Sequence, residues 1–175
     1  MNAVYGLLWL AALFKWGDLK NWKKYYSTIL FFALGDLLYL YLLSDRYPMW
    51  RYTPQGIDLE KGLTSAHISL SIILVKYPAT ILIYLSKFPK KKGVTQLFYI
   101  MCWVLLYSLN ELSDIKLNLI KYYNGWNFYW SIFFNAVMFS MLKVHYSRPI
   151  LAWLLSILFI VLLWNVFDVP KGVFR

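Results

Sequence analysis

The sequence predicts an all-α protein, a polytopic transmembrane bundle of six helices, or of five if residues 1–14 lie along the membrane surface. Apolar residues make up 61% of the 175 residues and charged residues only 15%, whereas soluble domains hold about 45–50% and about 25%. A soluble protein this small buries too little of its surface to hide so much apolar area. The apolar residues are also gathered into runs long enough to cross a bilayer.

Six apolar runs follow one another without a linker, so residues 1–175 are expected to form a single transmembrane domain. The runs are residues 1–14, Tyr25–Leu43, Leu63–Leu85, Val94–Leu112, Gly125–Leu142 and Ile150–Phe167. Apolar residues are consecutive in them, as in Ile29–Leu34, and do not alternate as in the strands of an outer-membrane barrel. Because lipid requires each segment to satisfy its own backbone groups, the runs are expected to be helices.

The first run is the shortest and needs its flanks to reach across the bilayer, which takes roughly 17–25 residues. No Lys or Arg precedes it, and Lys15–Asp18 does not have the small residues of a signal-peptide cleavage site. We interpret the run as a short first span, with an interfacial helix as the alternative.

Basic residues in the short loops predict the orientation of the bundle. The loops after the first, third and fifth runs hold ten of them: Lys15, Lys20, Lys23, Lys24, Lys87, Lys90, Lys91, Lys92, Lys143 and Arg148. The opposite loops hold five: Arg46, Arg51, Lys61, Lys116 and Lys121. The richer loops are therefore expected to face the cytoplasm, with both termini outside.

The net charge of +10 would suggest nucleic acid as the partner of a soluble protein. Here the charge lies in loops between apolar runs, so the lipid bilayer is the expected partner and nucleic acid is not. The lysines closest to the predicted membrane surface set the topology and are placed to contact anionic lipid headgroups. They are Lys23, Lys24, Lys90, Lys91 and Lys92.

Two opposite charges lie inside predicted spans, where ionisable groups are costly and usually face other helices. Counted from Lys24 and Lys87, Asp36 and Lys76 each lie about 17–18 Å deep at 1.5 Å per residue. Equal depth on consecutive antiparallel spans makes them a candidate ion pair, either structural or part of a proton or ion relay, unless the two do not meet. Pro78 removes the amide that would bond the Leu74 carbonyl, which predicts a kink or polar site beside Lys76.

Polar residues recur at helical spacing in the later spans. One series is Tyr107, Asn110, Glu111 and Asp114; another is Asn127, Ser131 and Asn135. Such groups either bond neighbouring helices together or line an outward-facing cavity. For a cavity we expect at least three of five residues of similar depth to converge around Glu111 as the anionic centre: His67, Asn110, Glu111, Asn127 and Asn165.

Enzyme motifs give no support for catalysis. The sequence has no His-Glu-x-x-His, Gly-x-Ser-x-Gly, phosphate-loop or paired-Cys pattern, and Cys102 is the only cysteine. Glu111 and Asp114 have oxygen ligands that suit a divalent cation, but carboxylates one turn apart are common at helix ends. These patterns leave any catalytic residues unidentified, and no metal or cofactor is expected.

Three stretches carry a resemblance to a known family: Leu13–Asp18, Asn124–Asn127 and Leu163–Pro170. In them and along its whole length the chain resembles a family of small multi-pass membrane proteins from endospore-forming Gram-positive bacteria. The family has no assigned activity, so the resemblance implies a bacterial cytoplasmic membrane and supplies no site residues.

These observations favour an accessory, sensory or scaffold component of that membrane. The alternative is a small transporter or channel subunit that uses the Asp36/Lys76 pair and the outward-facing polar pocket. A membrane-embedded enzyme is the third hypothesis.

Overall fold

The computed structural model describes residues 2–90 and 93–173 and is mostly helical, with 73% helix, which confirms the all-α class. A helix occupies each predicted apolar run. The elements in chain order are α1 (Asn2–Trp16), η1 (Leu19–Lys24), α2 (Tyr26–Leu42), β1 (Trp50–Tyr52), α3 (Ile57–Glu60), α4 (Ser65–Ser71), η2 (Ile72–Lys76), α5 (Tyr77–Tyr84), α6 (Val94–Lys116), β2 (Ile120–Tyr122), α7 (Phe128–Ser147), α8 (Pro149–Val166) and η3 (Lys171–Val173).

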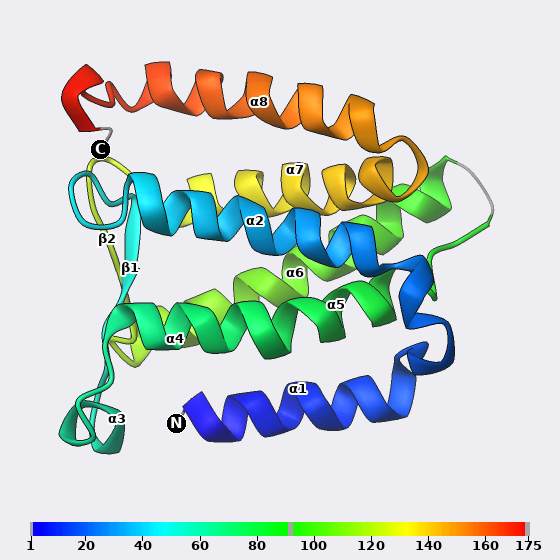
Figure 1. Ribbon diagram of the computed structural model, residues 1–175, viewed down its shortest axis with the longest axis horizontal. Coiled ribbons are helices and arrows are strands. Elements are labelled where there is room, and N and C mark those ends of the chain that lie inside the picture. The colour runs from blue at the N-terminus through cyan, green and yellow to red at the C-terminus, as the bar shows by residue number, and fades with distance from the viewer. Residues whose placement is uncertain (1, 91–92, 174–175) are drawn as a thin grey trace.

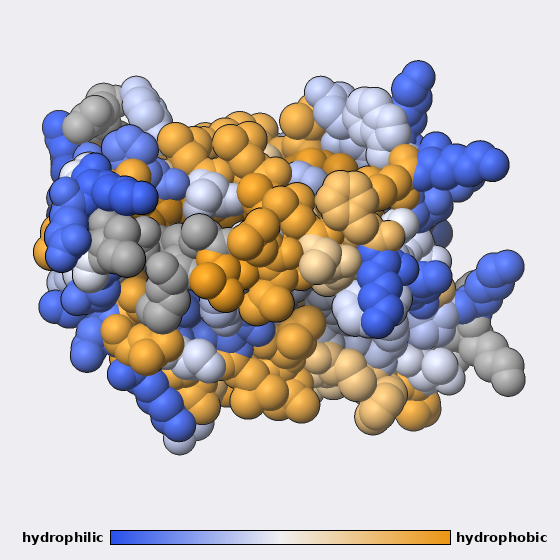
Figure 2. Space-filling view, turned by 90° about the horizontal axis from the view of Figure 1, so that it is seen from below, coloured by the Kyte–Doolittle hydropathy of each residue, from blue (hydrophilic) through white to orange (hydrophobic). Residues whose placement is uncertain are grey.

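The long helices lie side by side along one axis and run alternately up and down (Figure 1). Both chain termini lie at the end of the bundle that holds β1 and β2, which we call the strand end. The turns that contain Lys23, Lys24 and Lys90 lie at the opposite end, which we call the lysine end. On the face seen in Figure 2, hydrophobic residues form a band across the middle, with hydrophilic residues at both ends.

Two helical segments are both long and apolar enough to cross a membrane, Ser65–Tyr84 and Pro149–Val166. Val4–Trp16 and Tyr26–Leu42 are apolar but shorter. Helix α8 is the more lipid-like of the two long segments, because only 6% of its most apolar stretch is buried inside the protein. Composition and length therefore give weak support for a membrane protein.

A short turn at the lysine end joins α1 to η1. A Cβ at Gly17 would lie 2.6 Å from the Leu13 carbonyl oxygen, so this position requires glycine. The Asp18 carboxylate then caps η1 by accepting hydrogen bonds from the Asn21 amide groups and the Tyr25 hydroxyl. These bonds, above all the one from the Asn21 side chain, hold the pKa of Asp18 below its usual value.

Strands β1 and β2 form an antiparallel pair that the sequence pattern did not predict. Trp50 pairs with Tyr122 and Tyr52 with Ile120. The Tyr39 hydroxyl on α2 anchors the pair: it donates to the Trp50 carbonyl and accepts from the amides of Met49 and Trp50. The rings of Tyr39 and Trp50 also stack, with centroids 4.1 Å apart. The strand pair is thereby fixed across the strand end of the bundle.

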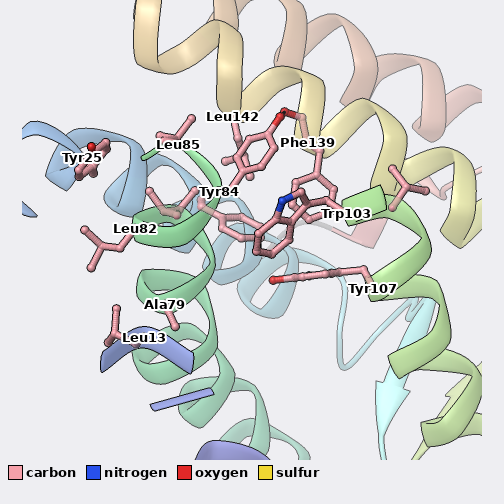
Figure 3. Packing of buried hydrophobic residues seen from close by; sticks show 13 residues of the cluster. Leu13, Tyr25, Ala79, Leu82, Tyr84, Leu85, Trp103, Tyr107, Phe139 and Leu142 are labelled. Carbon is pink, nitrogen blue, oxygen red and sulfur yellow. Dashed lines mark hydrogen bonds between the residues drawn. The ribbon is translucent and has the colours of Figure 1, made fainter. Parts of the chain in front are cut away.

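The core lies between α5, α6 and α7 and is built from aromatic rings (Figure 3). Tyr84 and Phe139 are fully buried, and the Tyr84 hydroxyl donates to the Phe139 carbonyl at 2.9 Å. The Phe139 ring meets Tyr107 edge to face, with centroids 4.9 Å apart, and Trp103 at 5.7 Å. This aromatic cluster therefore holds α6 against α7.

Candidate functional site

The third predicted span changes its helical geometry at Lys76. Because Pro78 has no amide to donate, the helix widens into the π-helical turn η2, and the Tyr77 amide bonds the Ile72 carbonyl. Beside Lys76, where the sequence predicted a kink or a polar site, the structure therefore has a π turn. This turn also brings two consecutive side chains, Lys76 and Tyr77, into the wall of one cavity. Such π turns occur frequently at functional sites.

That cavity, which we call the central cavity, has a volume of about 330 Å³ and lies between α2, η2, α6, α7 and α8, beneath the strand pair. Its charged lining residues are Asp36, Lys76, Glu111 and Asp114, and its polar ones include Tyr52, Tyr77, Tyr107, Ser131 and Asn135. Its other lining residues are mainly aromatic and aliphatic. The volume lies at the lower end of the range for small-molecule sites, about 300–1,000 Å³.

Two of the three carboxylates in the central cavity are held by hydroxyl groups. Glu111 accepts hydrogen bonds through Oε1 from the Tyr122 hydroxyl at 2.8 Å and the Ser131 hydroxyl at 2.7 Å. Asp36 accepts one from the Tyr77 hydroxyl at 3.1 Å. The Asp114 carboxylate accepts no hydrogen bond from the part of the chain that the structure describes. The carboxylates therefore keep acceptor capacity on the cavity side.

Lys76 does not form the predicted direct ion pair with Asp36. Its ammonium group lies over the Tyr107 ring, 4.2 Å from the centroid, and 5.6 Å from that of Trp9. No described carboxylate lies within 4.0 Å of it. The prediction matched depths along two helix axes, but depth does not fix the direction of a side chain around its axis. In the structure Lys76 points toward α1 and α6, while Asp36 meets the Tyr77 hydroxyl.

Asn135 is the polar residue that points most clearly to a ligand. Its side chain is only 7% exposed and lines the central cavity. Its side-chain amide makes no hydrogen bond to any residue that the structure describes, so its donor and acceptor groups are open to water or a solute in the cavity. Ser131, one turn earlier on α7, faces the same cavity. The central cavity therefore has hydrogen-bonding groups ready for a polar solute.

The predicted convergence of at least three of five outer residues is wrong, because Glu111 alone among the five lines the central cavity. Asn110 and Asn165 donate to the carbonyls of Leu106 and Val161 in their own helices. The other two cap helices. His67 bonds Thr64 at the start of α4, and Asn127 accepts from two amides at the start of α7. Local bonds satisfy these side chains, so they need no shared pocket.

Glu111 is joined instead by Asp36, Lys76 and Asp114, so the two predicted sites merge into one. Asp114, Ser131 and Asn135 were missing from the predicted site residues, although their helical spacing with Glu111 and Asn127 was a usable signal. Tyr77 and Tyr107 carried a weaker signal, because a tyrosine in an apolar run is usually read as a membrane-interface residue.

A second cavity of about 310 Å³ adjoins the central cavity at the strand end, and we call it the vestibule. Asp36, Tyr39, Trp50 and Tyr52 line both. The vestibule also touches Arg51, which bonds the Ser44 carbonyl and forms an ion pair with Asp45 at 3.4 Å. The Tyr39–Trp50 stack therefore separates a polar outer chamber from the central cavity, and Asp36 is accessible from both.

The structure describes three of the five lysines that were predicted to contact lipid. Lys23, Lys24 and Lys90 are exposed at the lysine end. Lys91 and Lys92 lie outside the described residues.

Within residues 2–90 and 93–173, no three His, Cys, Asp or Glu side chains lie close enough together to hold a metal ion. Comparison with protein-family models, curated proteins and solved structures finds no match to this chain.

Proposed function

We propose that this protein is a six-span protein of the bacterial cytoplasmic membrane whose central cavity binds a small cationic solute, as part of a small transporter. The observation that carries the proposal is the charge of the central cavity, whose lining has three carboxylates and a single lysine. An accessory or scaffold role gives no reason for this arrangement, because ionisable groups inside a span are costly.

The lengths of the longer helices suit a bilayer crossing, whereas α1 is shorter than the hydrocarbon core and needs its flanking residues to cross. At 1.5 Å per residue, α1 is about 22 Å long and α6 about 34 Å, and the other long helices fall between them. The hydrocarbon core of a bilayer is about 30 Å thick. The hydrophobic band between hydrophilic ends in Figure 2 suits the same placement.

A cation is the solute that this lining favours. Carboxylates attract it, and the face of an aromatic lining residue such as Trp126 attracts it as well. Its binding would also offset the cost of burying two more carboxylates than ammonium groups. The vestibule offers a path from the strand end to Asp36.

Binding of tetraphenylphosphonium tests the proposal, with tetraphenylborate as a probe of matched shape and opposite charge. In lipid nanodiscs, after subtraction of uptake by protein-free discs, we expect saturable binding of the phosphonium and none of the borate. Glu111→Gln should weaken phosphonium binding by about tenfold, because it removes one charged contact. Equilibrium dialysis with radiolabelled probes measures both.

Asp168→Asn is the matched control for this experiment. Asp168 is exposed, lies outside the lining of the central cavity and has a φ of 47°, which asparagine also tolerates. The control should leave binding unchanged. Equal binding of the two probes, or equal losses in the two variants, would contradict a cation site in the central cavity.

Cysteine labelling tests the proposed topology. In a Cys102→Ser background, we expect Gln55→Cys at the strand end to react with an impermeant maleimide in intact cells. Lys90→Cys at the lysine end should react only after the membrane is opened, because the loops rich in lysine are expected to face the cytoplasm. The reverse pattern would invert the proposed orientation, and labelling of both in intact cells would rule out a six-span arrangement.

The exposed lysines of the lysine end would then lie at the cytoplasmic surface. There Lys23, Lys24 and Lys90 contact anionic headgroups, each worth about 1 kcal/mol near a charged membrane.

A further inference from the structure

We infer that the solute is an amphiphile, with a cationic head among the carboxylates and a hydrocarbon body in an apolar cleft that opens sideways to lipid. This inference rests on the proposed function and adds the chemical class of the ligand and its route of entry.

The central cavity changes character along its length. Between its two ends the lining holds Asp36, Glu111 and Asn135. Toward the lysine end the cavity continues between α2, α7 and α8 as a cleft with apolar walls, lined by Phe32, Met138, Met141 and Leu142. No described lining residue between the charged groups and the lysine end is charged. A uniformly polar solute would leave this apolar half without a function.

The cleft is closed at its lysine end by aromatic contacts. Phe31 stacks on His145, with ring centroids 4.2 Å apart, and meets Trp153 edge to face at 4.8 Å. His145 is held in place by a hydrogen bond of 3.0 Å to the Thr28 hydroxyl. Phe31 and Asp36 both line the cavity, and five residues of helix separate them, a length of about 8 Å. This length suits the first part of an alkyl chain, the rest of which continues through the lateral opening into lipid.

The cleft is open on one long side, between α2 and α8. Lining residues on both helices are exposed there: Leu38 is 38% exposed, Ile160 45% and Trp153 36%. Gly35, which also lines the cavity, removes a side chain from the same opening, and a Cβ built on it would meet nothing within 4 Å. In the proposed membrane placement this opening lies at the level of the lipid chains. An amphiphile can therefore slide in from the bilayer with its head leading toward Asp36.

Charge complementarity selects the head of the amphiphile. The head and the chain of the amphiphile bind in different parts of the cavity. A quaternary ammonium or amine contacts the carboxylates, and an alkyl chain occupies the cleft. An anionic amphiphile of the same length would place its charge beside three carboxylates.

Filling the cleft at Gly35 tests the inference. We expect Gly35→Leu in nanodiscs to raise the inhibition constant of dodecyltrimethylammonium against radiolabelled tetraphenylphosphonium by about tenfold, the effect of losing one buried aliphatic group. The inhibition constant of tetraethylammonium, which has no long alkyl chain, should change by less than about twofold. Gly6→Leu is the control, because Gly6 is also helical, has nothing within 4 Å of its Cβ position and lies outside the cavity lining.

A second measurement does not depend on a variant. Dodecyltrimethylammonium with a diazirine at the chain end should label α2 or α8 between Phe31 and Leu38 or between Trp153 and Ile160. Excess unlabelled dodecyltrimethylammonium should suppress the labelling, and dodecyl sulfate at equal concentration should not.

The outcomes separate the two proposals. Loss of charge selectivity for tetraphenylphosphonium over tetraphenylborate overturns the proposed function and this inference with it. Retained charge selectivity with equal effects of Gly35→Leu on both ammonium competitors, or with labelling that no competitor suppresses, overturns the amphiphile alone. A change of oligomeric state in Gly35→Leu without a change in competition would assign the cleft to a second copy of the chain.

Discussion

Replacing Lys76 by methionine should lower the free energy of unfolding by about 3 kcal/mol, because it leaves the carboxylates of the central cavity without a compensating charge. Uncompensated buried charge typically costs about 3–5 kcal/mol, and we expect the lower end because Lys76 is only half-buried. Methionine keeps most of the side-chain volume and removes the ammonium group. Asp36, Glu111 and Asp114 then share one cavity without a compensating charge. The contact with the Tyr107 ring is also lost. Reversible unfolding by dodecyl sulfate in mixed micelles measures the change.

Second-site changes identify which carboxylates Lys76 balances. Since Lys76 forms no direct ion pair with Asp36, we expect Asp36→Asn, Glu111→Gln and Asp114→Asn each to recover part of the loss. If only Asp36→Asn recovered stability, the result would support the direct Asp36–Lys76 pair that the sequence predicted. Lys121→Met, on the exposed face of β2, is the control and should change stability by less than about 0.5 kcal/mol.

Truncation of Phe139 to alanine should cost about 2–3 kcal/mol. The same change in a water-soluble core costs about 3–5 kcal/mol, part of which is transfer of the ring from water. In a membrane the packing contacts are lost but lipid replaces water as the reference, so we expect a smaller effect. The Phe139 side chain is fully buried and contacts the rings of Tyr84, Trp103 and Tyr107.

Phe98→Ala is the matched control for the core. Phe98 is 70% exposed on α6 and should change stability by less than about 0.5 kcal/mol. The same unfolding assay compares the two variants. Equal effects would mean that the aromatic cluster does not hold α6 against α7.

Helix positions could be read from the sequence because each long helix contains a nearly unbroken apolar run, which needs no partner to be recognised. The boundaries differ where local bonds set them. Helix α7 begins at Phe128, three residues after the start of the predicted run, because the Asn127 side chain caps it. The strand pair has only three residues in each strand and depends on the Tyr39 hydroxyl from another element. No local pattern of either strand contains that information.

The candidate site was predictable in part for the same reason. The high cost of a charge inside an apolar run marks Asp36, Lys76 and Glu111 wherever they point. Whether such a group meets a partner depends on its angle around the helix axis, and this angle is fixed by packing between distant segments. The π-helical turn at Lys76 shows the effect, because one extra residue in the turn redirects Lys76 toward Tyr107 and leaves Asp36 to Tyr77.

The sequence by itself determined the helical class, the order of the helices and the residues whose burial needs an explanation, since all three follow from local composition and from spacing along one chain. Tertiary structure alone decided which of those residues share a cavity. Local bonds inside their own helices satisfy His67, Asn110, Asn127 and Asn165, whereas tertiary packing brings Asp36, Lys76, Glu111 and Asp114 from three helical segments to one space. The physical reason is that a polar side chain takes the nearest partner its backbone can offer, and only the groups without one are left to face a cavity.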